Sequence, residues 1–495
     1  MRQSLPDLLA EGAGGEAALI VPGLARLTYD ELREQVAATA GRLTSLGVER
    51  GDRVAYLHPN GAEAVILFLA AATAATAAPL NPAYKMEELR FYLEDTRARL
   101  LLVPPGGVEG ARAACPEGVA VIEAAFRDGE MRLAGSRAAP APSPAPDDVA
   151  LVLHTSGTTS RPKQVPIRHR NLAASAGNLI RHYGLMAEDV SLCVMPLFHV
   201  HGIVMSTLAA LGSGGAEVVM PGGFNAMGFW ALVREHRVTW FSAVPTIHQM
   251  LLRRSGSGRP EGARGLRFIR SSSSALSAAT MQQLEETIGV PVIEAYSMTE
   301  AAHQMTANPL PPGERRPGSV GRGAGVEVGI VDDAWRQQPA GTTGEVVVRG
   351  PSVVDGYANN QEANAASFRE GWFRTGDQGV LSEDGYLTLV GRLKELINRG
   401  GEKIAPREID DVLLQHPAVA EAVAFGLPHP TWGEEVAVAV VLREPVAERE
   451  LLRYCRERLA DFKVPKRVFI VDEIPRTATG KVQRRGVAAA LAPSA

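Results

Sequence analysis

The segment His154-Thr-Ser-Gly-Thr-Thr-Ser-Arg-Pro-Lys-Gln164 is the most informative part of this sequence. It follows the apolar run Val149–Leu153, which predicts a short buried strand. Its Ser, Thr and Gly residues leave backbone N–H groups and hydroxyls free to surround phosphate oxygens, and Lys163 adds positive charge. The spacing is not that of a Walker A loop. A single loop of this composition is more often a solvated turn, so its meaning depends on the rest of the chain.

Upstream of this segment, predicted helices and strands alternate. A capping box at Thr28-x-x-Glu31 begins a helix that ends at Gly47. The next segments predict a strand over Val54–Leu57 and a buried helix over Ala62–Ala77, and a Pro/Ala-rich linker occupies residues 138–146. This alternation favours a parallel α/β sheet.

Downstream, each further predicted strand ends in a polar or Pro-containing turn. The carboxyl ends of parallel strands meet at one edge of a sheet, where ligands bind. We therefore expect five polar loops to converge on one site. The predicted strands are Val190–Met195, Ala216–Met220, Val238–Ala243, Leu266–Ile269 and Val290–Glu294, and the turns include Pro196–Gly202, Val244–Thr246, Arg270–Ser274 and Ala295–Glu300.

The pattern changes near Gly318, where short strands separated by Gly, Pro and Asp turns predict a small β-rich subdomain over residues 318–393. Residues 394–495 read as a separate α+β domain with a helix over Pro406–Leu414 and a charged helix over Glu448–Leu459. We therefore expect an α/β protein with a large N-terminal domain over residues 1–393 and a small C-terminal domain.

Length and composition support this division. A chain of 495 residues, 45% hydrophobic and 21% charged, is typical of a globular protein with two or more domains. The net charge of −4 and a pI near 6.3 argue against nucleic acid as a partner. Three separated cysteines fit a reducing compartment, and neither a secretory signal nor a membrane span is recognisable. A cytoplasmic location is expected.

Five strings taken in order resemble the adenylate-forming superfamily, which includes acyl-CoA synthetases, luciferases and peptide synthetase adenylation domains. They are the predicted loops HTSGTTSRPK, YSMTE (296–300) and FRTGD (373–377), together with GRLKE (391–395) and TATGK (477–481). The resemblance covers nearly the whole chain. A closer similarity is to oxalate–CoA ligases, carried by PLFHVHG (196–202), FIRSSSSALS (268–277), EAYSMTEAAHQMTANPLPP (294–312), GRLKELINRGGEKI (391–404) and FKVPKRV (462–468).

This resemblance implies an N-terminal domain of parallel-type sheets with a small β-barrel-like subdomain, and a mobile C-terminal domain. It also implies a two-step ligase reaction. A carboxylate attacks the α-phosphate of ATP to give acyl-AMP and diphosphate, and the thiol of CoA then displaces AMP. The implied partners are ATP, Mg²⁺, CoA and a small carboxylic acid, in a monomer or homodimer.

The resemblance also implies roles for residues around the phosphates. Such a reaction depends on charge neutralisation and in-line positioning. Thr299 would donate to the α-phosphate, and Glu300 would hold Mg²⁺ together with Thr158; outside this context, Thr-Glu is most often a helix start. Lys481, on the mobile domain, would bridge the acid and the α-phosphate during adenylation. The β- and γ-phosphates would be held by Thr155, Ser156, Gly157, Thr158, Thr159 and Lys163.

The remaining nucleotide and CoA contacts follow from the same resemblance. Asp377 would accept from the ribose hydroxyls with help from Arg392, although a turn Asp explains this residue as well. Tyr296 would stack on adenine; the alternative is a core aromatic. Lys394 matches the hinge position, and Gly400 and Gly401 would help to line the pantetheine tunnel after domain rotation. Further residues expected to flank adenine are Ser273, Ser274, Ala275, Glu294 and Ala295.

The acid substrate is harder to infer. A small dianion requires hydrogen-bond donors and cations at short range. In the family, His199 lies beside the acyl pocket, and we assign His201, His303 and Ser272 to the distal carboxylate of oxalate. The His199-x-His201 pair could instead bind zinc, but no Cys, Asp or Glu stands at ligand spacing, and a structural histidine is the stronger alternative.

Two further points stay open. Relatives usually have Gly after the loop lysine, whereas this chain has Gln164, whose side chain is expected to crowd the loop or alter its backbone. We expect activity to survive because Lys163 and the hydroxyls remain. The competing functions are a ligase for malonate or a medium-chain fatty acid, a carrier-protein adenylation domain, and a nucleotide-binding protein that has lost catalysis.

Overall fold

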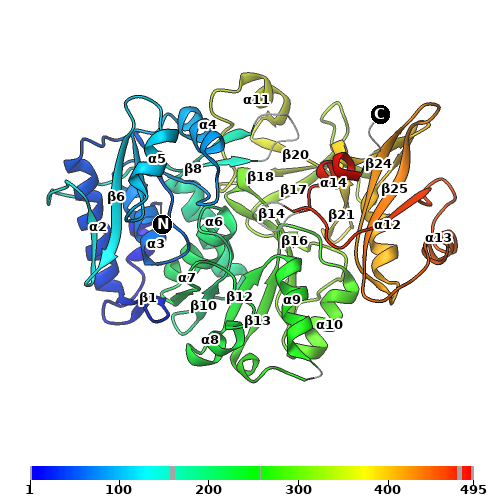
Figure 1. Ribbon diagram of the computed structural model, residues 1–495, viewed down its shortest axis with the longest axis horizontal. Helices are drawn as coiled ribbons and strands as arrows, with labels where there is room; N and C mark the ends of the chain where they lie inside the picture. Colours follow the sequence, from blue (N-terminus) through cyan, green and yellow to red (C-terminus); the bar gives the residue numbers. More distant parts are fainter. Residues whose placement is uncertain (1–2, 156–161, 257, 477–481, 492–495) are drawn as a thin grey trace.

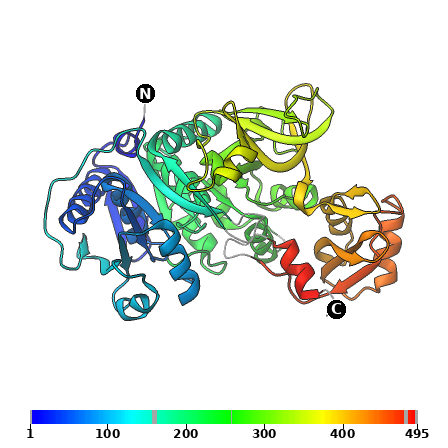
Figure 2. The ribbon, with the colours of Figure 1, turned by 90° about the horizontal axis from the view of Figure 1, so that it is seen from above.

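The computed structural model describes residues 3–155, 162–256, 258–476 and 482–491. Figures 1 and 2 show a large body formed by the N-terminal residues, with the segment after residue 394 at one end. The predicted residues Ser156, Gly157, Thr158, Thr159 and Lys481 lie outside the described residues.

A mainly parallel seven-stranded sheet carries the phosphate-type loop. Neighbouring strands are parallel except at the two ends, where β6–β7 and β8–β9 are antiparallel. The loop therefore connects the two strands of a hairpin at the sheet edge. In spatial order the strands are β7 (Glu130–Leu133), β6 (Ala120–Arg127), β5 (Leu100–Val103), β3 (Arg53–Tyr56), β4 (Thr76–Pro79), β8 (Val149–Thr155) and β9 (Lys163–Arg168).

A nine-stranded sheet carries most of the other predicted loops. It is parallel from β1 to β14 and antiparallel at both edges. In spatial order its strands are β16 (Arg322–Gly323), β15 (His303–Ala307), β14 (Val292–Met298), β13 (Phe268–Ser271), β12 (Trp240–Ala243), β10 (Val190–Cys193), β11 (Ala216–Val219), β1 (Ala17–Val21) and β2 (Ala25–Thr28).

Helices cover these sheets, and one apolar core joins both of them. The capping box at Thr28 begins α2 as predicted, with Glu31 bonded back to the cap. The N-terminal helices are α1 (Leu5–Leu9), α2 (Tyr29–Ser45), α3 (Ala62–Ala74), α4 (Met86–Thr96), α5 (Val108–Ala114), α6 (His169–Tyr183), η1 (His201–Leu208), α7 (Ala209–Gly212), α8 (Phe229–Glu235), α9 (Pro245–Ser255), η2 (Glu261–Gly265), α10 (Ala278–Ile288), η3 (Thr299–Ala301) and α11 (Gln361–Ser367).

Three boundary predictions were wrong. The helix predicted to reach Ala77 ends at Ala74, because Thr76–Pro79 forms the central strand β4, where the Thr76 hydroxyl donates to the Val149 carbonyl at 2.7 Å. The turn predicted over Ala295–Glu300 is largely strand, because β14 continues to Met298 against antiparallel β15. FRTGD is not a loop but lies inside β20 (Trp372–Leu381).

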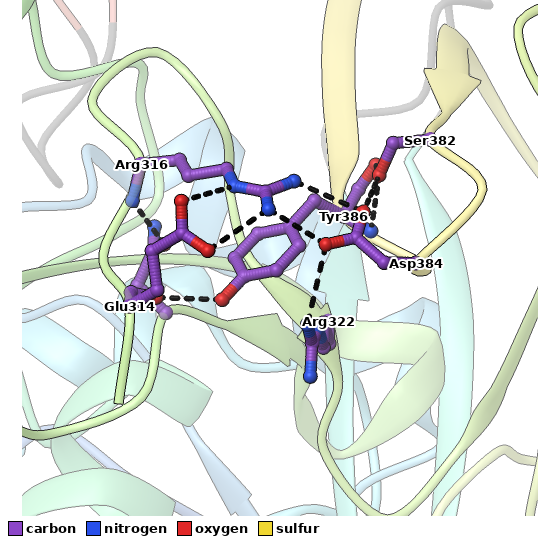
Figure 3. A network of polar contacts seen from close by, with 7 residues as sticks. Glu314, Arg316, Arg322, Ser382, Asp384 and Tyr386 are labelled. Atoms are coloured by element: carbon purple, nitrogen blue, oxygen red, sulfur yellow. Dashed lines mark hydrogen bonds and ion pairs between the residues drawn. The ribbon is translucent and has the colours of Figure 1, made fainter. Parts of the chain in front are cut away.

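The predicted β-rich subdomain is a five-stranded antiparallel sheet. An exposed ionic network joins the turn between β20 and β21 (Leu387–Arg392) to the loop that contains Glu314 and Arg316 (Figure 3). Arg316 pairs with both Glu314 and Asp384, and Tyr386 lies 3.9 Å from the Arg316 guanidinium, measured to the ring centre. The network therefore links residues 314–316 to the sheet that carries Asp377. Its strands are β17 (Glu327–Val331), β18 (Thr343–Arg349), β19 (Phe368–Arg369), β20 and β21 (Leu387–Arg392).

The C-terminal segment has its own sheet and its own apolar clusters. Within the described ranges, none of the helices is both long enough and apolar enough to cross a bilayer. The elements of this segment are η4 (Leu393–Glu395), β22 (Ile397–Arg399), β23 (Glu402–Ile404), α12 (Pro406–Leu414), β24 (Val419–His429), β25 (Gly433–Leu442), α13 (Glu448–Arg456), β26 (Arg467–Ile470) and α14 (Arg484–Leu491).

Candidate active site

A cavity of about 290 Å³ lies where β13, β14 and the β20–β21 pair meet the C-terminal segment. It collects the predicted adenine and ribose residues from three separate parts of the chain. Arg476 and Val482, which flank the stretch 477–481, also line it. The predicted residues on its wall are Ser273, Ser274, Ala275, Glu294, Ala295, Tyr296, Asp377 and Arg392.

Asp377 is fixed from two sides. Cross-strand pairing of β20 with β21 places it opposite Arg392, whose Nε lies 3.0 Å from Asp377 Oδ1. The hydroxyl of Tyr296 donates to Asp377 Oδ2. The Asp377 carboxylate raises the pKa of Arg392, so this arginine stays charged. A buried carboxylate held in this way presents its oxygens to a ligand in a defined orientation.

Glu294 forms part of the same wall and is almost completely buried. Its Oε1 accepts a hydrogen bond from the Leu276 backbone N–H at 3.0 Å, and Oε2 has no hydrogen-bond partner among the described residues. Burial raises the pKa of this carboxyl to about 7. Glu294 therefore changes charge near neutral pH.

The described part of the predicted phosphate site centres on Lys163 and Glu300. Tyr357 lies between them: its hydroxyl donates to Glu300 Oε1 at 2.8 Å, and Lys163 Nζ lies 4.4 Å from the centre of its ring. Burial raises the pKa of Glu300 and lowers that of Lys163, while the opposite charges counteract both shifts. Thr155 pairs with Lys163 across the β8–β9 hairpin, and Thr299 is buried beside Glu300 in η3.

A divalent cation fits this arrangement. Glu300 is a buried carboxylate whose charged form is disfavoured by its surroundings, and a bound cation stabilises that form. When bound, Mg²⁺ supplies charge neutralisation for a triphosphate. Glu300 would hold it; the second predicted ligand, Thr158, lies outside the described residues.

The predicted acid-binding histidines lie one layer behind the cavity wall. Both rings are fully buried, with centroids 5.1 Å apart. His201 bonds through Nδ1 to Ser273 Oγ at 3.1 Å and through Nε2 to Ser242 Oγ at 2.6 Å. Neither ring nitrogen of His303 has a hydrogen-bond partner within the described ranges. Burial, reinforced by Arg270, lowers the pKa of both histidines, so both are neutral near pH 7.

Arg270 brings a buried positive charge to this cluster. Its guanidinium donates to Ser242 Oγ at 3.0 Å, to the Tyr183 hydroxyl at 2.9 Å and to Gln304 Oε1 at 3.1 Å. All three acceptors are neutral, and the described residues provide no ion pair for it. An arginine in this position creates a positive potential that favours an anion.

The other two acid-site predictions have different surroundings. Ser272 is buried behind the cavity wall, and its hydroxyl lies 2.9 Å from the Oγ of Ser297, which lines the cavity. His199 is half-buried, and its Nδ1 accepts the backbone N–H of His201 at 3.2 Å. His199 therefore helps to hold the start of η1.

Some predicted residues do not reach the cavity wall. Gly400 and Gly401 form the turn between β22 and β23, both with positive φ angles. Lys394 lies in η4, exposed, and lowers the pKa of Lys163 together with burial. These three residues are absent from the described lining of the cavity.

The prediction that Gln164 crowds the loop or alters its backbone was wrong. Gln164 lies in β9 without a positive φ angle, and its side chain points to Asp95 instead of crowding the loop. The sequence predicted no role for Tyr357 and placed Arg270 only at the start of a polar turn, because the partners of both side chains come from distant segments.

Comparison with known proteins identifies the family. The model of the AMP-binding enzyme family matches residues 9–358, and that of the AMP-binding enzyme C-terminal domain matches residues 408–481. The chain belongs to this family of adenylate-forming enzymes, which confirms the predicted superfamily.

Individual relatives are similar over almost their full lengths. The chain is 48% identical to an oxalate–CoA ligase of Arabidopsis thaliana, covering 95% of each chain. It is 43% identical to an oxalate–CoA ligase of Saccharomyces cerevisiae, covering 96% of this chain and 95% of that protein. The crystal structure of ATP-bound MatB from Rhodopseudomonas palustris superposes with a TM-score of 0.92 at 31% identity over 99% of both chains. This similarity confirms the predicted fold class.

Proposed function

We propose that this enzyme is an oxalate–CoA ligase that converts oxalate, ATP and CoA into oxalyl-CoA, AMP and diphosphate. The family match and the named relatives make it an ATP-dependent, AMP-forming acyl-CoA synthetase, as predicted. ATP and CoA are its co-substrates and Mg²⁺ is its metal ion. A cytoplasmic location and a monomeric or homodimeric assembly stay predictions.

The first step forms a mixed anhydride. A carboxylate oxygen of oxalate bonds to the α-phosphorus of ATP, and the bond from that phosphorus to the bridging oxygen of diphosphate breaks. Thr155 and Lys163 would hold the departing diphosphate, Thr299 would donate to the α-phosphate, and Asp377 would fix the ribose. Lys481 would neutralise the charge that builds between the two anions.

The second step transfers the acyl group to sulfur. The CoA thiol loses its proton to solvent, its sulfur bonds to the acyl carbon, and AMP leaves with the bridging oxygen. We propose that residues 394–495 form the mobile domain that exchanges the Lys481 segment for the Gly400–Gly401 turn between the steps. The absence of this turn from the cavity wall, and the presence of Arg476 and Val482 on it, support the adenylation arrangement for this structure.

The choice of oxalate rests on the buried cluster formed by His201, His303 and Arg270. His303 offers a ring N–H with no acceptor within the described residues, and Arg270 supplies a positive charge without a carboxylate partner. A carboxylate of a short dianion would supply the acceptor that His303 lacks and the counter-ion that Arg270 lacks. The names of the oxalate–CoA ligase relatives support the same substrate.

Diphosphate exchange across a panel of acids tests this proposal. Oxalate should give the highest kcat/KM for acid-dependent exchange of labelled diphosphate into ATP, and CoA-dependent AMP release should follow the same order. A preference for malonate or a medium-chain fatty acid would replace oxalate by that acid. Activity with a carrier protein instead of CoA, or exchange with no acid at all, would contradict the proposed class.

A further inference from the structure

Side chains link β8 and β9, the two strands that the predicted phosphate loop connects. In the β8–β9 hairpin, His154 pairs with Gln164 and Thr155 pairs with Lys163. Residues directly opposite in antiparallel strands share a face, and successive residues alternate between faces. His154 and Gln164 therefore point to one side, and the proposed phosphate ligands Thr155 and Lys163 to the other.

The side chains of His154 and Gln164 reach the same residue, Asp95. His154 Nε2 lies 2.9 Å from Asp95 Oδ2, and Gln164 Nε2 donates to the same oxygen at 3.0 Å. Because a carboxylate oxygen only accepts, His154 carries its proton on Nε2. One carboxylate thus binds both strands of the hairpin.

Gln164 makes a second contact that fixes this arrangement to a helix. Its Nε2 also donates to the backbone carbonyl of Asp95 at 2.6 Å, in the last turn of α4. Carbonyls at the end of a helix lack a partner within the helix, so Gln164 satisfies one of them. The hairpin is therefore attached to a rigid element and not only to its neighbouring strand.

The cluster is largely shielded from water. Gln164 is 5% exposed, and the side chains of His154 and Asp95 are 7% and 21% exposed. The ring of Tyr92 packs edge-on against His154 with centroids 4.7 Å apart. A buried donor left without its partner costs free energy, so removing the Asp95 carboxylate would deprive His154 and Gln164 of the acceptor that they share.

The cluster also connects with the residues near the proposed metal ligand. The Gln164 carbonyl accepts the backbone N–H of Ala358 at 3.0 Å, next to Tyr357, which holds Glu300 and lies below Lys163. A shift of β9 would therefore move Lys163 relative to Glu300.

We propose that Asp95 is a positioning residue which, through His154 and Gln164, holds Thr155 and Lys163 in place for the terminal phosphates of ATP. This inference rests on the proposed role of Thr155 and Lys163. It assigns a function to Gln164, which in this chain is part of the phosphate site's support.

Nucleotide binding measured without any acid tests the proposal. We would measure the Kd of a non-hydrolysable Mg-ATP analogue and the Kd of AMP by calorimetry for Asp95→Ala and Gln164→Ala. The analogue's Kd should rise about tenfold in each variant, as expected for losing hydrogen bonds to a charged group. The Kd of AMP, which lacks the terminal phosphates, should stay within about twofold. The Kd of the analogue for the double variant should be no higher than that for the weaker-binding single variant, because the two residues act as a unit.

Matched variants separate positioning from general damage. Glu94→Ala removes an exposed carboxylate from the same helix and should change neither Kd. Asp95→Asn keeps one acceptor oxygen and should give an intermediate Kd for the analogue. Equal loss of affinity for the analogue and AMP, or a lower Tm with both affinities intact, would reduce Asp95 to a purely structural role.

Measurements on Lys163→Ala distinguish failure of the positioning proposal from failure of the assigned phosphate site. If Lys163→Ala weakens analogue binding and Asp95→Ala and Gln164→Ala do not, the positioning proposal fails alone. If Lys163→Ala leaves analogue binding unchanged, the assigned phosphate site is wrong, and the positioning proposal falls with it. The choice of oxalate does not enter either result.

Discussion

The Tyr296 hydroxyl donates a hydrogen bond to Asp377, across 81 positions of the sequence. Tyr296 comes from the nine-stranded sheet and Asp377 from the β-rich subdomain, so this bond joins the expected adenine and ribose contacts. The tyrosine was predicted to stack on adenine, and that role stays a prediction. Its hydroxyl has a separate role, which is to orient the carboxylate.

Replacing Tyr296 by Phe should therefore weaken binding of AMP and ATP equally. The ring is retained, but the buried Asp377 carboxylate loses a donor, which is worth about 1.5–3 kcal/mol for a charged hydrogen bond. We expect both Kd values to rise at least about tenfold, measured by calorimetry. A rise confined to ATP would place the effect at the phosphates and contradict this interpretation.

Replacing His303 by Ala should raise the KM of oxalate far more than the KM of ATP. The ring of His303 lies 5.1 Å from that of His201, which bonds to Ser273 on the cavity wall, so His303 belongs to the proposed acid site. Removing a donor to a charged group corresponds to about a tenfold effect or more. Steady-state kinetics with each substrate varied in turn gives both values. Equal changes in the two KM values would remove His303 from the acid site.

Replacing Lys481 by Ala should abolish formation of the acyl-adenylate while sparing the thioester step. The lysine is expected to act only while the carboxylate and the α-phosphate approach, when two anions must be brought together. Acid-dependent diphosphate exchange should fall by at least about a thousandfold, as when a preorganised charge-stabilising donor is lost. Transfer to CoA from chemically prepared oxalyl-AMP should continue at close to the parental rate. Exchange at the parental rate would exclude this role.

The raised pKa of Glu294 should make the unliganded protein less stable as the pH rises toward neutrality. Burial raises its pKa from 4.5 to about 7, so between these values the folded protein keeps a proton that the unfolded chain has released. The free energy of unfolding then falls with rising pH, by at most about 1.4 kcal/mol per unit for this group.

Glu294→Gln should remove this contribution. Urea unfolding at about pH 5 and about pH 7.5 should show a smaller loss of stability in the variant than in the parent protein. Glu94→Gln, on the exposed face of α4, serves as the control and should behave like the parent. An identical pH slope in all three proteins would show that Glu294 does not titrate as argued.

Periodicity and turn chemistry predicted the local elements well. The capping box at Thr28 begins α2, and Pro406–Leu414 is helical over the predicted bounds. Errors occurred where a partner strand overrides local preference. Thr76–Pro79 follows an alanine-rich helix and has no strong strand signal, but it pairs with β3 and β8 on either side. Such pairing depends on residues far away in the sequence.

The candidate site shows the same limit. Motif strings indicated which polar loops would meet, and eight of the predicted residues line one cavity. Their exact partners could not be predicted: Tyr357 reaches Glu300 from 57 positions away, and Asp95 reaches Gln164 from 69. A single side chain of this kind carries no local signal, because its importance comes from what the fold places opposite it.

Arg270 has no carboxylate partner among the described residues, and this affects which acids the enzyme would exclude. A fatty acid would bring hydrocarbon up to this buried cation without offering a counter-ion, whereas a second carboxylate would supply one. Discrimination of this kind increases with the hydrophobicity of the competing acid and does not require steric exclusion. The proposed acid site would thus discriminate against a hydrocarbon acid through the energy of a buried cation left without a counter-ion, and enlarging that site would not by itself create a fatty-acid enzyme.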